Sequence, residues 1–187
     1  MKKLITFALC GLTALSASAE KADAGKQAEI LYNTAHADQV TQTSTLTGDV
    51  VVTKGTLLLR AEKAVLKQTP EQDMLVTLNA GGGKPATFRQ KRDGGPDLWV
   101  EGEAQRIEYD ERSAVVKLFG AAKIRQLEGS RTTDEIQSEF ISYDSLREVF
   151  ESRNDGAKGG ATRSKMIIAP RKPRPAPPAA ANPASAP

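Results

Sequence analysis

The stretch 46–66, LTGDVVVTKGTLLLRAEKAVL, constrains the fold of this chain more than any other segment. Short runs of valine, leucine and threonine are separated by glycine, and such runs are typical of β-strands joined by tight turns, because glycine allows the positive φ that a tight turn needs. The pattern predicts strands at 49–53, 56–61 and 63–67, with Lys54-Gly55 as the first turn and a polar break before the third strand. This stretch therefore predicts an antiparallel β-meander.

Similar strand patterns continue through most of the chain, so the predicted fold class is all-β, built of antiparallel strands. Alternation is clearest at 105–109, where Ile107 and Tyr109 fall on one face and the charged residues between them on the other. A weak strand is expected at 30–32 and a polar edge hairpin at 38–45. The remaining predicted strands are 74–78, 86–91, 98–101, 105–109, 114–119, 121–126, 136–143, 147–152 and 163–169.

Internal repeats support a stacked arrangement of these strands. The motif A-x-x-I-x-Y-D at 104–110 recurs as S-x-x-I-x-Y-D at 138–144, and L-x-G-x-V-x-V at 46–52 resembles L-x-G-x-A-x-I at 118–124. A repeated strand–turn–strand unit cannot bury its apolar face alone, so it predicts a long sheet or a pair of sheets.

Residues 1–19 have the features of a cleavable secretory signal. Two lysines precede the apolar run 4–15, and the sequence ASA at 17–19 provides an A-x-A cleavage site. The apolar run is too short to span a bilayer as a stable helix. Cys10 is the only cysteine, so a mature chain that begins at Glu20 is expected to have no thiol and no disulfide.

The rest of the chain divides into three parts. Residues 20–28 are charged and alanine-rich and are expected to fray, residues 29–170 form the predicted folded domain, and residues 171–187 are a Pro/Ala-rich tail that is expected to be disordered. Of the 26 basic residues, two belong to the signal and three to the tail, which leaves 21 against 23 acidic residues in the middle. This balance does not support nucleic-acid binding by the folded domain.

Residues suited to catalysis or metal binding are scarce. His36 is the only histidine and lies in a polar segment without a nucleophile motif nearby, and a zinc site draws on several His and Cys side chains. The loop 81–85 lacks the Gly-Lys-Ser/Thr end of a phosphate-binding loop. The acidic pairs 101/103 and 110/111 are interpreted as solvated groups on turns and outer faces. We therefore predict no enzyme activity, no metal site and no cofactor.

Apolar residues follow one face of every predicted strand and form the predicted inward-facing set. Taken singly, they suit an ordinary sandwich core. Aromatic residues are only 5% of the chain, however, so a thinly filled sandwich would leave a slot suited to alkyl chains. The candidate lipid-groove residues are Val50, Val52, Leu57, Leu59, Leu66, Leu75, Phe88, Ile107, Tyr109, Val116, Leu118, Ile124, Ile141, Tyr143 and Phe150.

Four segments together resemble the OstA-like family of periplasmic lipopolysaccharide-transport proteins, over about residues 31–170. They are 46–66, GKPATFRQ at 83–90, EGEAQRIEYD at 101–110 and VVKLFGAAKIRQ at 115–126. The resemblance implies a twisted β-jelly-roll, open at both ends, in which two facing sheets enclose an apolar groove. It implies binding of lipopolysaccharide and head-to-tail self-association into a periplasmic bridge from an inner-membrane transport complex to an outer-membrane translocon.

Strands at the two ends of the series are the predicted partner edges, because unpaired backbone groups there can accept a partner's strand. The residues are Ile30, Leu31 and Tyr32 at one end, and Lys165, Met166, Ile167, Ile168 and Ala169 at the other. A structural or scaffold β-protein of the cell envelope that carries no lipid remains the alternative, and an envelope enzyme a distant third. Capture of lipopolysaccharide by a photo-crosslinker at Ile107 or Ile141 would distinguish the first two.

Overall fold

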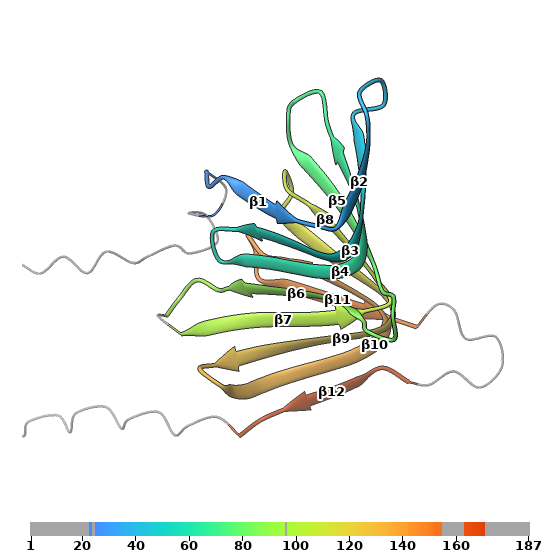
Figure 1. The fold of residues 1–187 in the computed structure, drawn as a ribbon. Coiled ribbons are helices and arrows are strands. Elements are labelled where there is room, and N and C mark those ends of the chain that lie inside the picture. The colour runs from blue at the N-terminus through green and yellow to red at the C-terminus, as the bar shows by residue number, and fades with distance from the viewer. Residues whose placement is uncertain (1–22, 24, 96, 155–162, 171–187) are drawn as a thin grey trace, which may run out of the picture.

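The computed structural model describes residues 23, 25–95, 97–154 and 163–170, and its strands join in one antiparallel network (Figure 1). This arrangement confirms the predicted all-β class. The predicted signal at 1–19 and tail at 171–187 lie outside the described residues. The strands are β1 (Ala28–Leu31), β2 (Thr34–Asp38), β3 (Thr43–Lys54), β4 (Leu57–Gln68), β5 (Met74–Asn79), β6 (Ala86–Lys91), β7 (Leu98–Ala104), β8 (Arg106–Asp110), β9 (Val115–Glu128), β10 (Arg131–Asp144), β11 (Val149–Arg153) and β12 (Lys165–Ile168).

Four long strands, β3, β4, β9 and β10, divide the network into two sheets. Each pairs with different neighbours along its two halves; for example, β4 pairs with β6 and then with β5, and β9 pairs with β8 and then with β7. The first sheet contains β2, β5, β8 and β11, the second contains β1, β6, β7 and β12, and the long strands contribute to both. Figure 1 shows the two groups of strands leaving a common corner in different directions. This is the predicted open jelly-roll with two facing sheets.

The long strands change sheet at β-bulges. Gly48 and Asp49 of β3 lie opposite a single residue of β4, and Gly120 and Ala121 of β9 lie opposite a single residue of β10. All four residues have positive φ, from 46° to 85°, a region that glycine adopts without strain. A bulge bends a strand without ending it. The sequence repeat L-x-G-x therefore corresponds to the corner, which both β3 and β9 cross in the same way.

These bends correct two predicted strand boundaries. The predicted strands 56–61 and 63–67 form one continuous β4, and 114–119 and 121–126 form one continuous β9. Glu62 and Gly120 were interpreted as ends of strands. Each lies at the corner, and strand pairing resumes within two residues on either side. The polar break and the glycine were thus signals of a bend within a strand.

The beginning of the described chain also differs from the expected fraying of residues 20–28. Asp23 is buried and accepts hydrogen bonds from the backbone N of Thr56 at 2.9 Å and from its Oγ1 at 2.5 Å. Ala28 already belongs to β1, opposite Lys54. The carboxylate of Asp23 satisfies a backbone donor of the β3–β4 turn, which fixes the chain before the first strand.

Candidate functional site

The inner face of the second sheet carries one apolar row that runs from edge to edge. Each member of the row is paired in register with the next one across neighbouring strands, so all of them share a face. From β1 to β12 the row is Ile30, Val52, Leu59, Phe88, Gly102, Ile124, Ile136 and Met166. Apolar surface therefore reaches both open edges of this sheet.

The first sheet faces it with two similar rows. The sequence repeat explains their regularity, because β8 and β10 pair with opposite sides of β9: the isoleucines of the two copies flank Leu118, and the tyrosines flank Val116. The row nearer the corner is Leu46, Ala64, Leu78, Ile107, Leu118 and Ile141. The row nearer the free end is Leu66, Val76, Tyr109, Val116, Tyr143 and Phe150.

Most of the predicted groove residues meet in this interior. Thirteen of the fifteen have at most 9% of their surface exposed, and Phe150 is half-buried and packs against them. The buried ones are Val50, Val52, Leu57, Leu59, Leu66, Phe88, Ile107, Tyr109, Val116, Leu118, Ile124, Ile141 and Tyr143. The structure thus brings together side chains from both sheets that are up to 93 positions apart, as from Val50 to Tyr143.

Leu75 was assigned to the wrong face of its strand. It is 37% exposed and lies opposite Asp110, whereas Val76 and Leu78 of the same strand are buried. Three apolar residues in succession, Met74 to Val76, leave the phase of a short strand open. The pairing with β8 fixes that phase, because directly opposed residues share a face.

The interior is filled by its own side chains. The Phe88 ring of the second sheet lies 6.4 Å from the Tyr143 ring of the first, and Tyr143 stacks on Phe150 at 4.4 Å. Gly102 provides the room for Phe88, since a Cβ at Gly102 would lie 2.6 Å from Phe88 Cδ1 and 2.8 Å from Leu118 Cδ2. The space expected to hold a groove is occupied by the residues expected to line it.

Two ion pairs join the free ends of the sheets, which are the ends away from the corner. Lys54, the last residue of β3 in the second sheet, pairs with Glu111, which follows β8 in the first sheet. Glu111 also accepts a hydrogen bond from the backbone N of Met74 at 2.8 Å. Arg92, which follows β6, pairs with Glu148 between β10 and β11, with 3.1 Å between Nη2 and Oε2. Both pairs close the interior on the side opposite the corner.

The strand patterns did not single out these residues. Glu111 was interpreted as solvated, but the structure places its carboxylate against the buried ammonium of Lys54. The two-residue alternation of a strand would have predicted that two polar side chains face inward. Lys54 follows the inward Val52 by two residues, and Gln90 follows the inward Phe88 by two. Both polar side chains are accordingly buried on the inner face of the second sheet.

Tyr109 is a buried titratable group of this interior. Its burial, and then the negative charges of Asp23 and Asp110, raise the pKa of Tyr109 to about 12. The side chain is therefore a neutral phenol under physiological conditions and contributes an apolar ring to the row nearer the free end.

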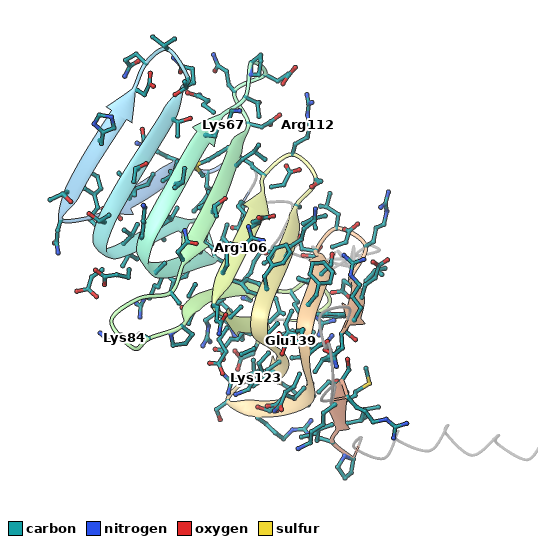
Figure 2. All side chains as sticks on the ribbon, turned by 90° about the vertical axis from the view of Figure 1, so that its right-hand side faces the viewer. Lys67, Lys84, Arg106, Arg112, Lys123 and Glu139 are labelled. Carbon is teal, nitrogen blue, oxygen red and sulfur yellow. The ribbon has the colours of Figure 1, made fainter. Side chains whose placement is uncertain are left out.

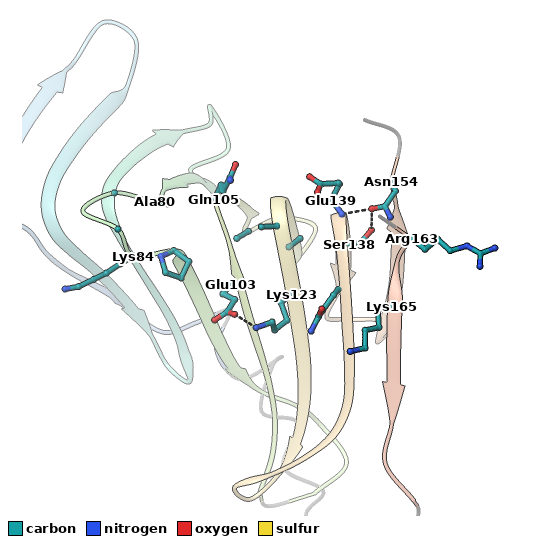
Figure 3. Close-up of a pocket in the computed structure, with 17 residues that line it drawn as sticks. Ala80, Lys84, Glu103, Gln105, Lys123, Ser138, Glu139, Asn154, Arg163 and Lys165 are labelled. Carbon is teal, nitrogen blue, oxygen red and sulfur yellow. Dashed lines mark hydrogen bonds and ion pairs between the residues drawn. The ribbon is translucent and has the colours of Figure 1, made fainter. Parts of the chain in front are cut away.

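A cleft of about 870 Å³, lined by both charged and apolar residues, lies at the corner (Figure 3). Part of its lining is a row of outward residues in register across four strands, namely Glu103, Lys123, Gln137 and Lys165. Lys123 Nζ lies 2.7 Å from Glu103 Oε1. Figure 2 shows Lys84, Lys123 and Glu139 on this side of the molecule. The inward-facing Ala104 and Ala122 also line the cleft, so the cleft adjoins the apolar interior at the corner.

Neither a metal site nor a membrane-spanning helix is found in the described ranges. His36 is exposed on β2, and no group of three or more His, Cys, Asp or Glu side chains within residues 23, 25–95, 97–154 and 163–170 is placed to hold a metal ion. In the same residues, no helix has the length and apolar character needed to cross a bilayer.

Both predicted partner edges lie at edges of the second sheet. β1 pairs only with β3, and β12 pairs only with β10. Ile30 packs partly against the core, while Leu31 and Tyr32 are exposed. Met166, Ile167 and Ile168 of β12 are 60%, 46% and 61% exposed. The first sheet ends at β2 and β11. The polar edge hairpin expected at 38–45 falls at the β2–β3 connection, whereas the sequence patterns did not identify the edge at β11.

A family model described as LptA/(LptD N-terminal domain) LPS transport protein matches residues 29–149. The chain belongs to this family. It is 27% identical over 154 residues to the lipopolysaccharide export system protein LptA of Haemophilus influenzae, covering 82% of this chain and 86% of that protein. It is 32% identical over 128 residues to LptH of Pseudomonas aeruginosa, covering 67% and 69%.

The fold is also similar to the crystal structure of LptH, described as the LptA-homologous periplasmic component of the lipopolysaccharide transport device of P. aeruginosa. The TM-score is 0.69 at 24% identity, over 79% of this chain and 99% of that one. The family is one of LPS transport proteins, and this membership does not favour the alternative of a lipid-free envelope scaffold.

Proposed function

We propose that this protein carries lipopolysaccharide in the periplasm by holding its acyl chains between the two sheets. The observation that supports the proposal is the apolar row that crosses the second sheet from Ile30 to Met166 without interruption by a polar residue. In a family of lipopolysaccharide transport proteins, such a face keeps acyl chains away from water over the full width of the molecule. Each buried CH₂ is worth about 0.8 kcal/mol.

Binding of acyl chains requires the sheets to separate, because their own side chains fill the space between them. Separation replaces contacts such as that between Phe88 and Tyr143 with contacts to the acyl chains. One apolar surface is exchanged for another, so the hydrophobic free energy lost between the sheets is regained on the lipid. Ile107 and Ile141, at the centre of the first sheet's inner face, are proposed to contact the chains.

We further propose that end strands pair with other copies and with components of the inner-membrane complex and the outer-membrane translocon. On β12, the hydrogen bond from Ala169 N to Thr133 O, 2.7 Å long, identifies a hydrogen-bonded antiparallel pair. Because such pairs alternate along a ladder, Ile167 directs its N–H toward β10, and Met166 and Ile168 direct theirs toward the open edge. An added strand would bond to Met166 and Ile168.

Photo-crosslinking in cells tests the cargo. A crosslinking residue at Ile107 or Ile141 is expected to capture lipopolysaccharide, because both side chains lie in the proposed path of the acyl chains. The same residue at Arg112, an exposed position outside the interior, serves as the control and is expected to capture none. Capture at Arg112 alone, or at none of the three positions in a folded and exported protein, would indicate a scaffold without lipid.

Two proline variants test the edge. Met166→Pro removes an N–H that faces the open edge, so it is expected to abolish head-to-tail oligomers in light scattering while changing the free energy of unfolding by less than about 1 kcal/mol. Ile167→Pro removes a donor of the β10–β12 ladder and is expected to lower stability. Oligomers that persist unchanged in Met166→Pro would contradict pairing through β12.

A further inference from the structure

The inner face of the second sheet changes character from the corner to the free end. Nearest the corner it carries mostly alanines, then the row of large apolar side chains, and nearest the free end a layer in which polar residues alternate with apolar ones. The small residues are Ala61, Ala86, Ala104 and Ala122, all buried. The polar residues near the free end, called the polar layer, are Lys54, Gln90 and Arg92, and the buried Leu57 and Val100 lie directly opposite Lys54 and Gln90. A surface graded in this way is complementary to an amphiphile whose chain ends point to the corner and whose headgroup lies at the free end.

Two buried atoms of the polar layer indicate that a ligand can bind here. Gln90 is 4% exposed, and its Oε1 is buried without a hydrogen-bond partner in the part of the chain that the structure describes. The Nε of Arg92 is buried in the same situation, although its Nη1 bonds to Gln126 Oε1 at 3.1 Å and its Nη2 to Glu148. Buried polar atoms are nearly always hydrogen-bonded, so an acceptor and a donor are available here to a polar group that enters between the sheets.

We propose that Lys54, Gln90 and Arg92 form a binding site for the phosphorylated sugar headgroup of the lipid. This inference rests on the proposed function and adds the chemistry that the headgroup must have. Guanidinium and ammonium groups are the side chains that bind phosphate oxygens most strongly. The Oε1 of Gln90 lies on the same inner face and accepts a hydrogen bond from a sugar hydroxyl or amide.

Glu111 and Glu148 hold this site closed in the absence of lipid. Both belong to the first sheet and neutralise Lys54 and Arg92 of the second. When the sheets separate, both ion pairs break, and leaving a buried charge without a partner is strongly unfavourable. A phosphate group that takes the place of each carboxylate removes this penalty, whereas a lipid with an uncharged headgroup does not. The site therefore selects phosphorylated lipids.

The test compares two lipids that differ only in phosphate. The affinities of the full mature chain for lipid A and for chemically dephosphorylated lipid A with the same acyl chains are measured by displacement of a fluorescent fatty acid. The wild type is expected to bind lipid A at least about tenfold more tightly, the size of one charge-assisted hydrogen bond. In Lys54→Gln/Arg92→Gln the ratio of the two affinities is expected to fall to about one.

Matched variants separate a binding role from a structural one. Arg89→Gln removes a charge of the same strand from the outer face, where Arg89 pairs with Glu101, and is expected to keep the wild-type ratio. Because the double variant leaves two glutamates unpaired, the quadruple variant with Glu111→Gln and Glu148→Gln is measured beside it, and circular dichroism verifies that it is folded. Its ratio is expected to be about one as well.

The outcomes distinguish this inference from the proposed function. If the wild type binds both lipids equally, or if the folded quadruple variant keeps the wild-type ratio, the headgroup site is wrong and the lipid-carrying function stands. If the wild type binds neither lipid, the proposed function itself is wrong.

Discussion

The substitution Gly102→Ala tests how tightly the two sheets pack. The added Cβ would lie 2.6 Å from Phe88 Cδ1 and 2.8 Å from Leu118 Cδ2. Phe88 faces Tyr143 on its other side, so the ring has little room to retreat. Overpacking of this kind lowers the free energy of unfolding by about 1–3 kcal/mol. Replacing glycine by alanine also raises it by about 0.4–1 kcal/mol, because alanine reduces the conformational entropy of the unfolded chain. We expect the free energy of unfolding to fall by about 1–2 kcal/mol.

Urea unfolding measures this change through the fluorescence of Trp99, the only tryptophan, which lies on β7 beneath the guanidinium of Arg89. With a urea m-value of about 1–3 kcal/mol per molar, the midpoint is expected to fall by about 0.5–1 M. Gly25→Ala is the control, because a Cβ there meets nothing within 4 Å. A midpoint for Gly102→Ala equal to or above that of the wild type would refute the tight packing of Phe88 against this strand.

Three further predictions concern stability. Leu78→Ala is expected to cost about 2–5 kcal/mol and Leu75→Ala less than about 1 kcal/mol in urea unfolding, because only Leu78 faces the core. The raised pKa of Tyr109 means that the folded protein retains the phenolic proton above the unfolded value near 10. The wild type should therefore lose up to about 3 kcal/mol relative to Tyr109→Phe between pH 10 and 12, measured by denaturant unfolding across that range. Asp23→Ala removes two hydrogen bonds from Thr56 and is expected to lower the free energy of unfolding by about 1–3 kcal/mol, measured by thermal unfolding.

Each of these predictions has a result that contradicts it. Equal midpoints for the two leucine variants would mean that the assigned phase of β5 is wrong. A difference between wild type and Tyr109→Phe that does not change above pH 10 would mean that the phenol is not buried. An unchanged melting temperature for Asp23→Ala would mean that the contact with Thr56 does not stabilise the start of the chain.

Strand periodicity predicted the parts of the fold that depend on local alternation. Ile107 and Tyr109 alternate with charged neighbours, and the repeat around Ile141 and Tyr143 has the same spacing, so their shared inward face followed from the sequence alone. Their burial against β9 confirms it. The inward face of these residues could be predicted without knowing which strands they pair with.

Features that depend on distant partners were not predicted. The phase of Leu75 is set by β8, and the continuity of β4 through Glu62 is set by the bulge of β3. The ion pair between Lys54 and Glu111 joins residues 57 positions apart in different sheets. No local pattern indicates such a pair, because it exists only once the long strands have bent at the corner.

A distance measurement between the two sheets tests the central claim, that lipid enters by separating them. Spin labels are attached to cysteines introduced at Arg112 and Ser130 of the mature chain, two exposed turn positions at the free ends of the first and second sheets. Pulsed electron paramagnetic resonance then records the distance distribution with and without lipid A. We predict a shift to longer distances when lipid A binds. An unchanged distribution in a sample that demonstrably contains bound lipid would contradict this account.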